Sequence, residues 1–176
     1  MIKNSKTILN LGAGKDLIPQ AITVDFNSAL TPDVVHDLNQ FPWPFADNSF
    51  DEIYAKDVLE HLGNLVRVME EIHRIARPGA KIFIVTPHYS CPNSWRDPTH
   101  QQHLSFFSFD YFTGKNQWNF YTKVRFKKTK TVLQFYPNLK NKIFWRIANR
   151  WPRFYEEHLA WIFPAWVMHF ELETLK

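Results

Sequence analysis

Short apolar runs, separated by polar or glycine-containing turns, mark the first half of the chain. Each run is apolar over nearly its whole length, which predicts strands buried on both faces. Between the fourth and fifth runs, residues 58–77 carry apolar side chains at three- and four-residue steps, which predicts a helix that ends at Pro78-Gly79. Strands that alternate with helical stretches predict a parallel α/β sheet. The predicted strands span residues 6–11, 21–25, 33–36, 50–55 and 80–86.

The last third of the chain has a different pattern. Residues 123–127 and 168–173 alternate between apolar and polar side chains. Such alternation predicts antiparallel edge strands with one face towards water. The stretch between them, residues 139–163, is basic and aromatic, and we expect it to be helical with a break at Trp151-Pro152.

Length and composition indicate one globular domain over residues 1–176, with residues 1–88 and 89–176 as its two halves. The single cysteine, Cys91, cannot form an internal disulfide, so we expect a reducing, cytoplasmic compartment. The polar residues 1–5 have no signal-peptide pattern, and no apolar run reaches the ~18 residues of a membrane-spanning helix.

The net charge of +4 conceals a strong asymmetry along the chain. Residues 1–114 carry a net −4, residues 115–153 carry +11 without a single acid, and residues 154–176 carry −3. One interpretation of the basic stretch is a solvated face. The other is a surface for an anionic partner, either RNA, whose bases its aromatic side chains could stack, or an acidic membrane surface.

Three predicted strands end on residues suited to an adenosine-containing ligand. The first ends in the turn that contains Gly12 and Gly14, the second ends on Asp25, and the third is followed by Asp37 and Leu38. In an open α/β sheet, ligands bind at the carboxyl ends of the strands. Asp25 could accept both hydroxyls of a ribose, while Asp37 could accept from an adenine amino group beside the apolar Leu38. Each residue alone is weak evidence, but their order and spacing together predict an adenosine site.

Together with the segment that follows them, these strand ends make residues 7–88 resemble the class I methyltransferases, especially a compact group similar to type 11 methyltransferases. The resemblance rests on strand–GxG, strand–Asp and a central segment, FPWPFADNSFDEIY at residues 41–54, followed by DVLEHL at 57–62 and EIHRIARPG at 71–79. It implies a Rossmann-like, seven-stranded, mostly parallel sheet with an antiparallel last hairpin and S-adenosylmethionine as cofactor. The implied cofactor residues are Gly12 and Gly14 at the methionine moiety, Asp25 at the ribose, Asp37 and Leu38 at the adenine, and Ala55 and Lys56 after the fourth strand.

A dinucleotide-binding Rossmann domain is the main competitor. The third glycine position of its G-x-G-x-x-G turn holds Leu17, and Asp25 follows Gly14 by 11 residues rather than the roughly 20 of the dinucleotide fingerprint. Residues 15–20, interrupted by Pro19, also leave little room for the first crossover helix, which we expect to be shortened. An open cofactor pocket, or a non-catalytic relative, is therefore an alternative.

Acid–base and metal candidates fall in two places. Asp57, Glu60 and His61 follow the fourth strand, and His88, His100 and His103 follow the fifth. The first group resembles the metal site of the small-RNA 2′-O-methyltransferases, which implies Asp57, Glu60, His61 and His103 as ligands of a magnesium-like ion. The competing interpretation is that Asp57 only caps a helix and that Leu-Glu-His holds no metal. A zinc site that includes Cys91, Asp97, His100 and His103 is a weaker alternative. His88, His100 and His103 are the catalytic candidates.

These observations predict an enzyme that methylates a small molecule or glycan-type acceptor at oxygen. The aromatic and polar residues 89–121 would form the substrate wall. Two alternatives remain open: a binding or regulatory module without turnover, and an RNA 2′-O-type methyltransferase.

Overall fold

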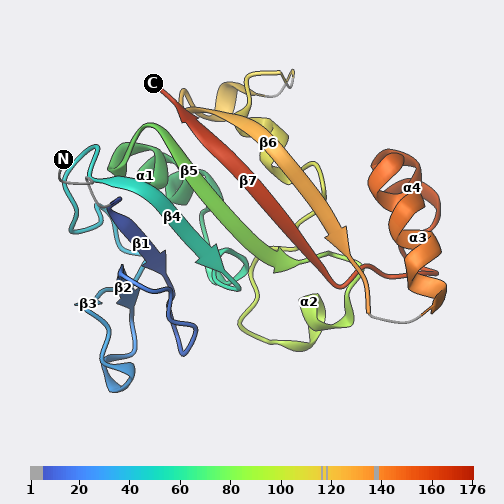
Figure 1. Cartoon of the computed structure of the whole chain (residues 1–176), viewed down its shortest axis with the longest axis horizontal. Helices are drawn as coiled ribbons and strands as arrows, with labels where there is room; N and C mark the ends of the chain where they lie inside the picture. The colour runs from blue at the N-terminus through green and yellow to red at the C-terminus, as the bar shows by residue number, and fades with distance from the viewer. Residues whose placement is uncertain (1–5, 116, 118, 137–138) are drawn as a thin grey trace, which may run out of the picture.

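The computed structural model describes residues 6–115, 117, 119–136 and 139–176. Within these residues, seven strands form one sheet in the order β3-β2-β1-β4-β5-β7-β6 (Figure 1). The pairs among β1 to β5 are parallel, and β7 is antiparallel to both of its neighbours. The expected mostly parallel sheet with a reversed last hairpin is confirmed. The strands are β1 (Ile8–Leu11), β2 (Ala21–Asp25), β3 (Val34–Val35), β4 (Phe50–Lys56), β5 (Ala76–Pro87), β6 (Arg125–Gln134) and β7 (Val167–Leu175).

Helix α1 (Leu65–Ile75) covers one face of the sheet. It begins at Asn64, whose side-chain oxygen accepts from the backbone N–H of Arg67, and it buries Val68, Met69 and Ile72 against the strands. In Figure 1 it lies behind β4 and β5. The other helices are α2 (Pro92–Arg96), α3 (Leu139–Arg150) and α4 (Pro152–His158), with short 3₁₀ turns at Ser28–Leu30, Leu59–His61, Ser108–Phe112 and Asn119–Tyr121.

The expected helix over residues 58–77 is wrong in its extent. The chain makes a 3₁₀ turn at Leu59–His61, restarts as α1 at the Asn64 cap, and leaves the helix after Ile75. Ala76 already pairs with Phe50 as part of β5, so Pro78-Gly79 lies inside a strand next to a β-bulge rather than at a helix end. Apolar periodicity did not distinguish a helix from a turn followed by a helix, since both bury every third or fourth residue.

The C-terminal elements agree with the sequence. The predicted helical stretch forms the pair α3 and α4, broken at Trp151, although α4 ends at His158 rather than at 163. The alternating segment 168–173 lies in β7, and the segment 123–127 enters β6 at Arg125. Met168, Phe170 and Leu172 of β7 are buried, whereas His169 and Glu171 on the opposite side are half-buried.

The face of the sheet opposite α1 is open. Residues 12–20, between β1 and β2, contain no helix, and in the described part of the chain no helix crosses in front of β1, β4 and β5 (Figure 1). Cross-strand ion pairs line this face instead, including Lys81–Glu173 and Lys130–Glu171. The first crossover helix, which the sequence predicted to be shortened, is therefore missing altogether. The charged side chains on this face make the exposed strands compatible with water.

Candidate functional site

The turn after β1 brings the backbone of Gly12 close to the side chain of Val58, which follows β4. Gly12 has φ +58°, and a Cβ atom there would lie 2.4 Å from Cγ2 of Val58. No L-residue fits this combination of left-handed backbone and close approach. The glycine therefore allows the turn after β1 to pack against Val58 at the carboxyl end of the strand.

Asp25, at the end of β2, is fixed by the same turn. The Gly14 N–H donates to its Oδ2 at 2.9 Å, and the Asn27 N–H donates to its Oδ1 at 2.9 Å. The residue is only 7% exposed. Both carboxylate oxygens are thus oriented by the backbone and keep lone pairs for a ligand.

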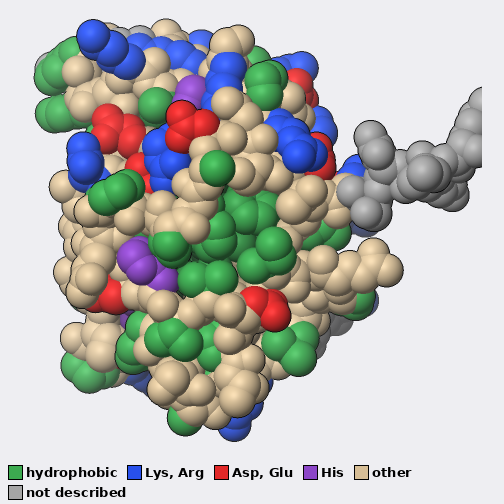
Figure 2. Space-filling view, turned by 90° about the vertical axis from the view of Figure 1, so that its left-hand side faces the viewer, with side chains coloured by type: hydrophobic (Ala, Val, Ile, Leu, Met, Phe, Trp, Pro, Cys, Tyr) green, Lys and Arg blue, Asp and Glu red, His purple; other side chains and the backbone are tan. Residues whose placement is uncertain are grey.

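A cavity of about 1030 Å³ lies over these strand ends. Four of the predicted cofactor residues line it: Gly12, Asp25, Asp37 and Leu38. Phe26 and Val35 add exposed apolar surface to the same wall. Viewed from the β2–β3 end of the sheet, hydrophobic side chains gather in the middle of the surface, with acidic and histidine side chains around them (Figure 2). An apolar wall with a few oriented carboxylates suits a nucleoside.

The other three predicted cofactor residues do not line this cavity. Gly14 acts through Asp25, and Ala55 is fully buried in the core. Lys56 forms an ion pair with Asp16 at 2.5 Å and pairs in register with Val85 on the open face. Asp57 and Val58 line the cavity in their place. The reason is local, because β4 runs to Lys56 and only the next residue, Asp57, turns away from the strand at φ +49°.

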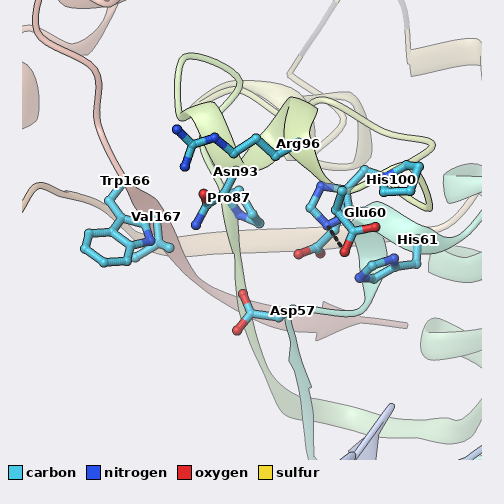
Figure 3. A pocket seen from close by; sticks show the side chains of 11 residues that line it. Asp57, Glu60, His61, Pro87, Asn93, Arg96, His100, Trp166 and Val167 are labelled. Carbon is cyan, nitrogen blue, oxygen red and sulfur yellow. Dashed lines mark ion pairs between the residues drawn. The ribbon is translucent and has the colours of Figure 1, made fainter.

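A second cavity of about 650 Å³, whose lining is shown in Figure 3, shares lining residues with the first. Asp57 and His61 line both cavities. Arg96 and Asn93 of α2 face Trp166 across its far end in Figure 3. Pro87 ends the segment that resembles the methyltransferases, and Asn93 and Arg96 lie in residues 89–121, the expected substrate wall. Trp166 and Val167 lack any motif and enter from about 70 residues further along the chain, so sequence reasoning missed them.

Glu60 is the most unusual group in this second cavity. It is 2% exposed, and among the described residues no hydrogen bond of normal geometry reaches either carboxylate oxygen. The nearby Thr86 hydroxyl lowers the pKa of Glu60 less than burial raises it. Burial raises the pKa of Glu60 to about 7. Burial also raises the pKa of the neighbouring Asp57 above its ordinary value. A buried carboxyl without a partner is costly unless it meets a ligand, a proton or a metal.

The two histidines beside Glu60 have their tautomers set by hydrogen bonds. The Thr99 hydroxyl donates to Asp97 at 2.6 Å, so its oxygen accepts from Nδ1–H of His61 at 2.8 Å. Nδ1–H of His100 donates to the Ser94 carbonyl at 3.1 Å. Each ring therefore keeps a lone pair on Nε2. Burial lowers the pKa of His61, which favours this neutral form.

Glu60, His61 and His100 each offer a ligand atom, and these atoms lie within 4.8 Å of one another. The His61 and His100 ring centroids are 4.5 Å apart. This trio differs from the predicted metal set, which contained Asp57 and His103. Asp57 lines the cavity but lies outside the trio, and its left-handed backbone rules out the helix cap considered as an alternative, since α1 is capped by Asn64.

Two of the catalytic candidates lie elsewhere. His88 is fully buried, with Nδ1 bonded to Ser90 and Nε2 3.0 Å from Glu156, so it joins β5 to α4. His103 stacks on Trp95 with ring centroids 3.6 Å apart and bonds Ser94, and it does not line the second cavity. The spacing of the histidine run could not tell which ring faces inwards, because residues 97–104 form an irregular loop. Cys91 is buried outside the trio, which gives no geometry for the zinc alternative.

A family model described as a methyltransferase domain matches residues 9–84. A sterol 4-C-methyltransferase of Caenorhabditis elegans is 44% identical over 41 residues, which cover 23% of this chain and 12% of that protein. A glycine/sarcosine/dimethylglycine N-methyltransferase of Actinopolyspora halophila is 36% identical over 44 residues, which cover 25% of this chain and 8% of that protein. The chain thus spans about a tenth of the length of these curated relatives.

Solved structures extend the similarity of fold to nearly the whole chain. The YcgJ protein of Bacillus subtilis superimposes with a TM-score of 0.62 at 14% identity, over 98% of this chain and 93% of that one. A SAM-dependent methyltransferase of Archaeoglobus fulgidus gives a TM-score of 0.58 at 19% identity, over 98% and 87%.

The position of β7 decides between the two nucleotide-binding folds considered. An antiparallel strand inserted between β5 and β6 departs from the order 3-2-1-4-5-6 of the dinucleotide-binding domains. No helix long and apolar enough to cross a membrane is found in the described chain. The strand order and the fold neighbours show that this chain has the fold of the class I S-adenosylmethionine-dependent methyltransferases, and its residues 9–84 match a methyltransferase domain.

Proposed function

We propose that this chain transfers a methyl group from S-adenosylmethionine to an oxygen of a small-molecule or glycan-type acceptor. The observation that carries this proposal is the junction of the two cavities, which share Asp57 and His61 as a common wall. One cavity has hydrogen-bond acceptors suited to an adenosine, and the other holds groups that can accept a proton. A cofactor in the first cavity and an acceptor in the second would meet at that wall.

On the cofactor side, the chain supplies orientation. The Asp25 carboxylate, held by two backbone N–H groups, is suited to accept the ribose hydroxyls. Asp37 and Leu38 would hold the adenine, and Gly12, which lines the same cavity, would lie at the methionine moiety. When bound, S-adenosylmethionine supplies an electrophilic methyl group with a neutral thioether as leaving group. The protein therefore has no leaving group to protonate, and its contribution is mainly alignment.

On the acceptor side, the chain supplies a base. A hydroxyl nucleophile has to lose its proton, and His100 presents a lone pair on Nε2 to receive it. Asp97, whose Oδ2 lies 3.9 Å from that nitrogen, would stabilise the resulting imidazolium. His100 is thus the catalytic candidate retained from the three that the sequence offered. Glutamine at this position would remove the base, and we expect kcat to fall by about 100-fold.

A metal-assisted variant of this reaction is a second candidate, favoured by the unpartnered oxygens of Glu60. Glu60, His61 and His100 would be the ligands, and a divalent ion would lower the pKa of the acceptor hydroxyl. Two imidazoles and one carboxylate suit zinc or manganese better than the magnesium-like ion expected from oxygen ligands. Chelator treatment that abolishes turnover, with recovery on adding one of these ions, would support this variant. Full turnover in chelator would leave His100 as the base.

The acceptor class rests on chemistry rather than on the relatives. Their names specify a sterol carbon and amine nitrogens as methylation sites. Both are small molecules, which supports a small acceptor here, while Glu60 and His100 favour an oxygen, whose proton has to be removed. We place the reaction in the cytoplasm, since the lone Cys91 is buried and forms no disulfide.

Calorimetric titration with S-adenosylmethionine, followed by transfer of labelled methyl to metabolite, glycan and RNA fractions, tests the proposal. We expect binding and label in a small-molecule or glycan fraction. An absence of binding at millimolar cofactor would overturn every enzymatic interpretation. Binding without any labelled product would favour the non-catalytic alternative, and label in RNA alone would replace the small-molecule acceptor.

A further inference from the structure

The surface of α3, α4 and the turn after α4, residues 142–162, exposes an unusual number of large apolar side chains. We call it the α3–α4 surface. Ile143 is 61% exposed, and Trp161 and Ile162 are both 68% exposed. Monomeric proteins seldom leave so many large apolar groups in water within one short segment. Its exposed apolar residues are Ile143, Trp145, Trp151, Phe154, Trp161 and Ile162.

Cations lie among these apolar groups. Lys142, Arg146 and Arg150 recur every four residues on the outer side of α3, and Arg153 lies in the first turn of α4. Arg150 also lies over the ring of Trp151, 5.6 Å from its centroid. Four cations on one short surface, next to exposed indoles, favour an anionic partner.

Acidic side chains do little to neutralise this charge. Glu156 turns inwards, where it bonds His88 and the backbone N–H of Phe106. Glu157 forms an ion pair with Arg153. Within the described residues, no ion pair neutralises the other three cations of the surface.

The exposed groups are held on a fixed scaffold. Phe144 stacks on Phe163 at 3.7 Å, and the Asn149 side chain bonds both the N–H and the carbonyl of Leu133 in β6. The Tyr155 ring is fully buried, and its hydroxyl donates to Phe163. The apolar groups are therefore displayed by packed helices. In Figure 1, α3 and α4 lie at the end of the molecule opposite β1, β2 and β3.

The aliphatic residues discriminate between the two kinds of anionic partner. Nucleic acid would use cations for phosphates and aromatic rings for bases, but it gains nothing from Ile143 and Ile162. A bilayer uses all three groups: basic side chains at anionic headgroups, indoles at the interface, and aliphatic side chains at the acyl boundary. We propose that the α3–α4 surface docks this protein on an anionic lipid bilayer.

Co-sedimentation of the full chain with vesicles tests this docking without any cofactor or acceptor. The probes are vesicles of phosphatidylcholine alone and of equal parts phosphatidylcholine and phosphatidylglycerol. We expect strong partitioning to the anionic vesicles that weakens with salt. Ile143→Ser with Ile162→Ser removes aliphatic area and should lower the partition coefficient at least tenfold on anionic vesicles. Arg146→Gln with Arg150→Gln should lower it about 25-fold there, at roughly fivefold per charge, and leave the weak binding to neutral vesicles unchanged.

Matched controls lie elsewhere on the molecule. Leu17→Ser removes a 73% exposed aliphatic group beside β2, and Lys123→Gln with Lys127→Gln removes two exposed cations before and within β6. Both controls should partition like the parent chain. Equal loss in the controls, no partitioning at all, or partitioning indifferent to the isoleucines would overturn the proposal. Tight binding of a single-stranded oligoribonucleotide that needs Arg146 and Arg150 but not the isoleucines would assign the surface to RNA instead.

Discussion

The two adjoining cavities are built in different ways although they share Asp57 and His61. The first cavity, which we propose binds the cofactor and call the cofactor cavity, is formed at the carboxyl ends of the strands. Backbone atoms set its key features, which are the left-handed Gly12 and the N–H groups that hold Asp25. The second cavity, which we propose binds the methyl acceptor and call the acceptor cavity, is formed by side chains from three places. These are the 3₁₀ turn at Leu59–His61, α2 with its following loop, and the start of β7.

Because of this difference, the cofactor cavity serves a general function and the acceptor cavity a specific one. Backbone geometry follows from topology and tolerates change in most neighbouring side chains, and the cavity over the strand ends forms although residues 12–20 contain no helix. The acceptor cavity depends on individual side chains such as Glu60, whose burial is unfavourable without a ligand. We therefore expect the cofactor cavity to fail through backbone changes and the acceptor cavity to respond to single charges.

The largest effect should come from Gly12→Ala. The new Cβ would meet the stiff side chain of Val58 at 2.4 Å in a left-handed backbone. Overpacking and the backbone conformation together should lower the free energy of unfolding by about 3 kcal/mol. The displaced Val58 should narrow the cavity and reduce affinity for S-adenosylmethionine about a hundredfold, measured by calorimetry.

Gly79→Ala is the control for backbone strain alone. Gly79 also has a positive φ, +76°, but a Cβ there meets nothing within 4 Å. This variant should lose about 1 kcal/mol of stability and keep its cofactor affinity. Equal affinity for cofactor in both variants would show that the turn after β1 does not shape the cavity.

The next largest effect concerns Glu60. Its folded-state pKa of about 7 lies above the ordinary 4.5, so its charge destabilises the folded state increasingly as the pH rises from about 4.5 to about 7. Glu60→Gln should match the parent chain at pH 4.5 and be more stable by about 3 kcal/mol at pH 8, measured by denaturant unfolding in chelator. Its methyl-transfer rate should fall at the same time if the carboxyl serves the acceptor.

The stability change caused by Glu71→Gln should have the opposite sign at high pH. Burial acts to raise the pKa of Glu71, but hydrogen bonds from Arg74 and from the Trp43 N–H lower it below its ordinary value. The stabilisation from this charge is present above that ordinary value and is lost as the pH falls, so the variant should be destabilised at pH 8 and less so in acid. If Glu60→Gln were also destabilised at pH 8, an unseen partner would have to hold its carboxylate.

Asp25→Asn should have an intermediate effect on cofactor binding. An asparagine places an NH₂ group against one of the two backbone N–H donors, from Gly14 or Asn27, that the carboxylate now accepts. Loss of a hydrogen bond to a charged group costs about 2 kcal/mol, so we expect affinity for S-adenosylmethionine to fall about thirtyfold.

Asp33→Asn provides a matched comparison. The Asp33 carboxylate also accepts from the backbone, through the N–H of Thr23, as well as from the Thr23 hydroxyl, but it does not line the cofactor cavity. We expect it to lower the melting temperature without changing cofactor affinity. Similar affinity losses in both variants would reduce Asp25 to a purely structural role.

The same contrast explains what the sequence could predict. Buried runs and strand-end acids fix the sheet and four residues of the cofactor cavity, because parallel strands bring their carboxyl ends to one edge. The histidines after β5 could not be ranked, because hydrogen bonds within an irregular loop, such as that from His100 to Ser94, decide which ring faces the cavity. Trp166 and Val167 carry no local signal, since only the pairing of β7 with β5 brings them there.

The smallest effect should come from Lys56, which the family pattern assigned to the cofactor pocket. Its side chain is half exposed and pairs with Asp16 on the open face, so Lys56→Gln should change stability by under about 1 kcal/mol and cofactor affinity by less than about twofold. The neighbouring Asp57→Ala is the matched variant, since Asp57 lines both cavities and an alanine tolerates φ +49° poorly. It should lower affinity clearly more than Lys56→Gln does in the same calorimetric titration. A larger loss from Lys56→Gln would mean that the strand end of β4 turns towards the cofactor one residue earlier than the structure places it.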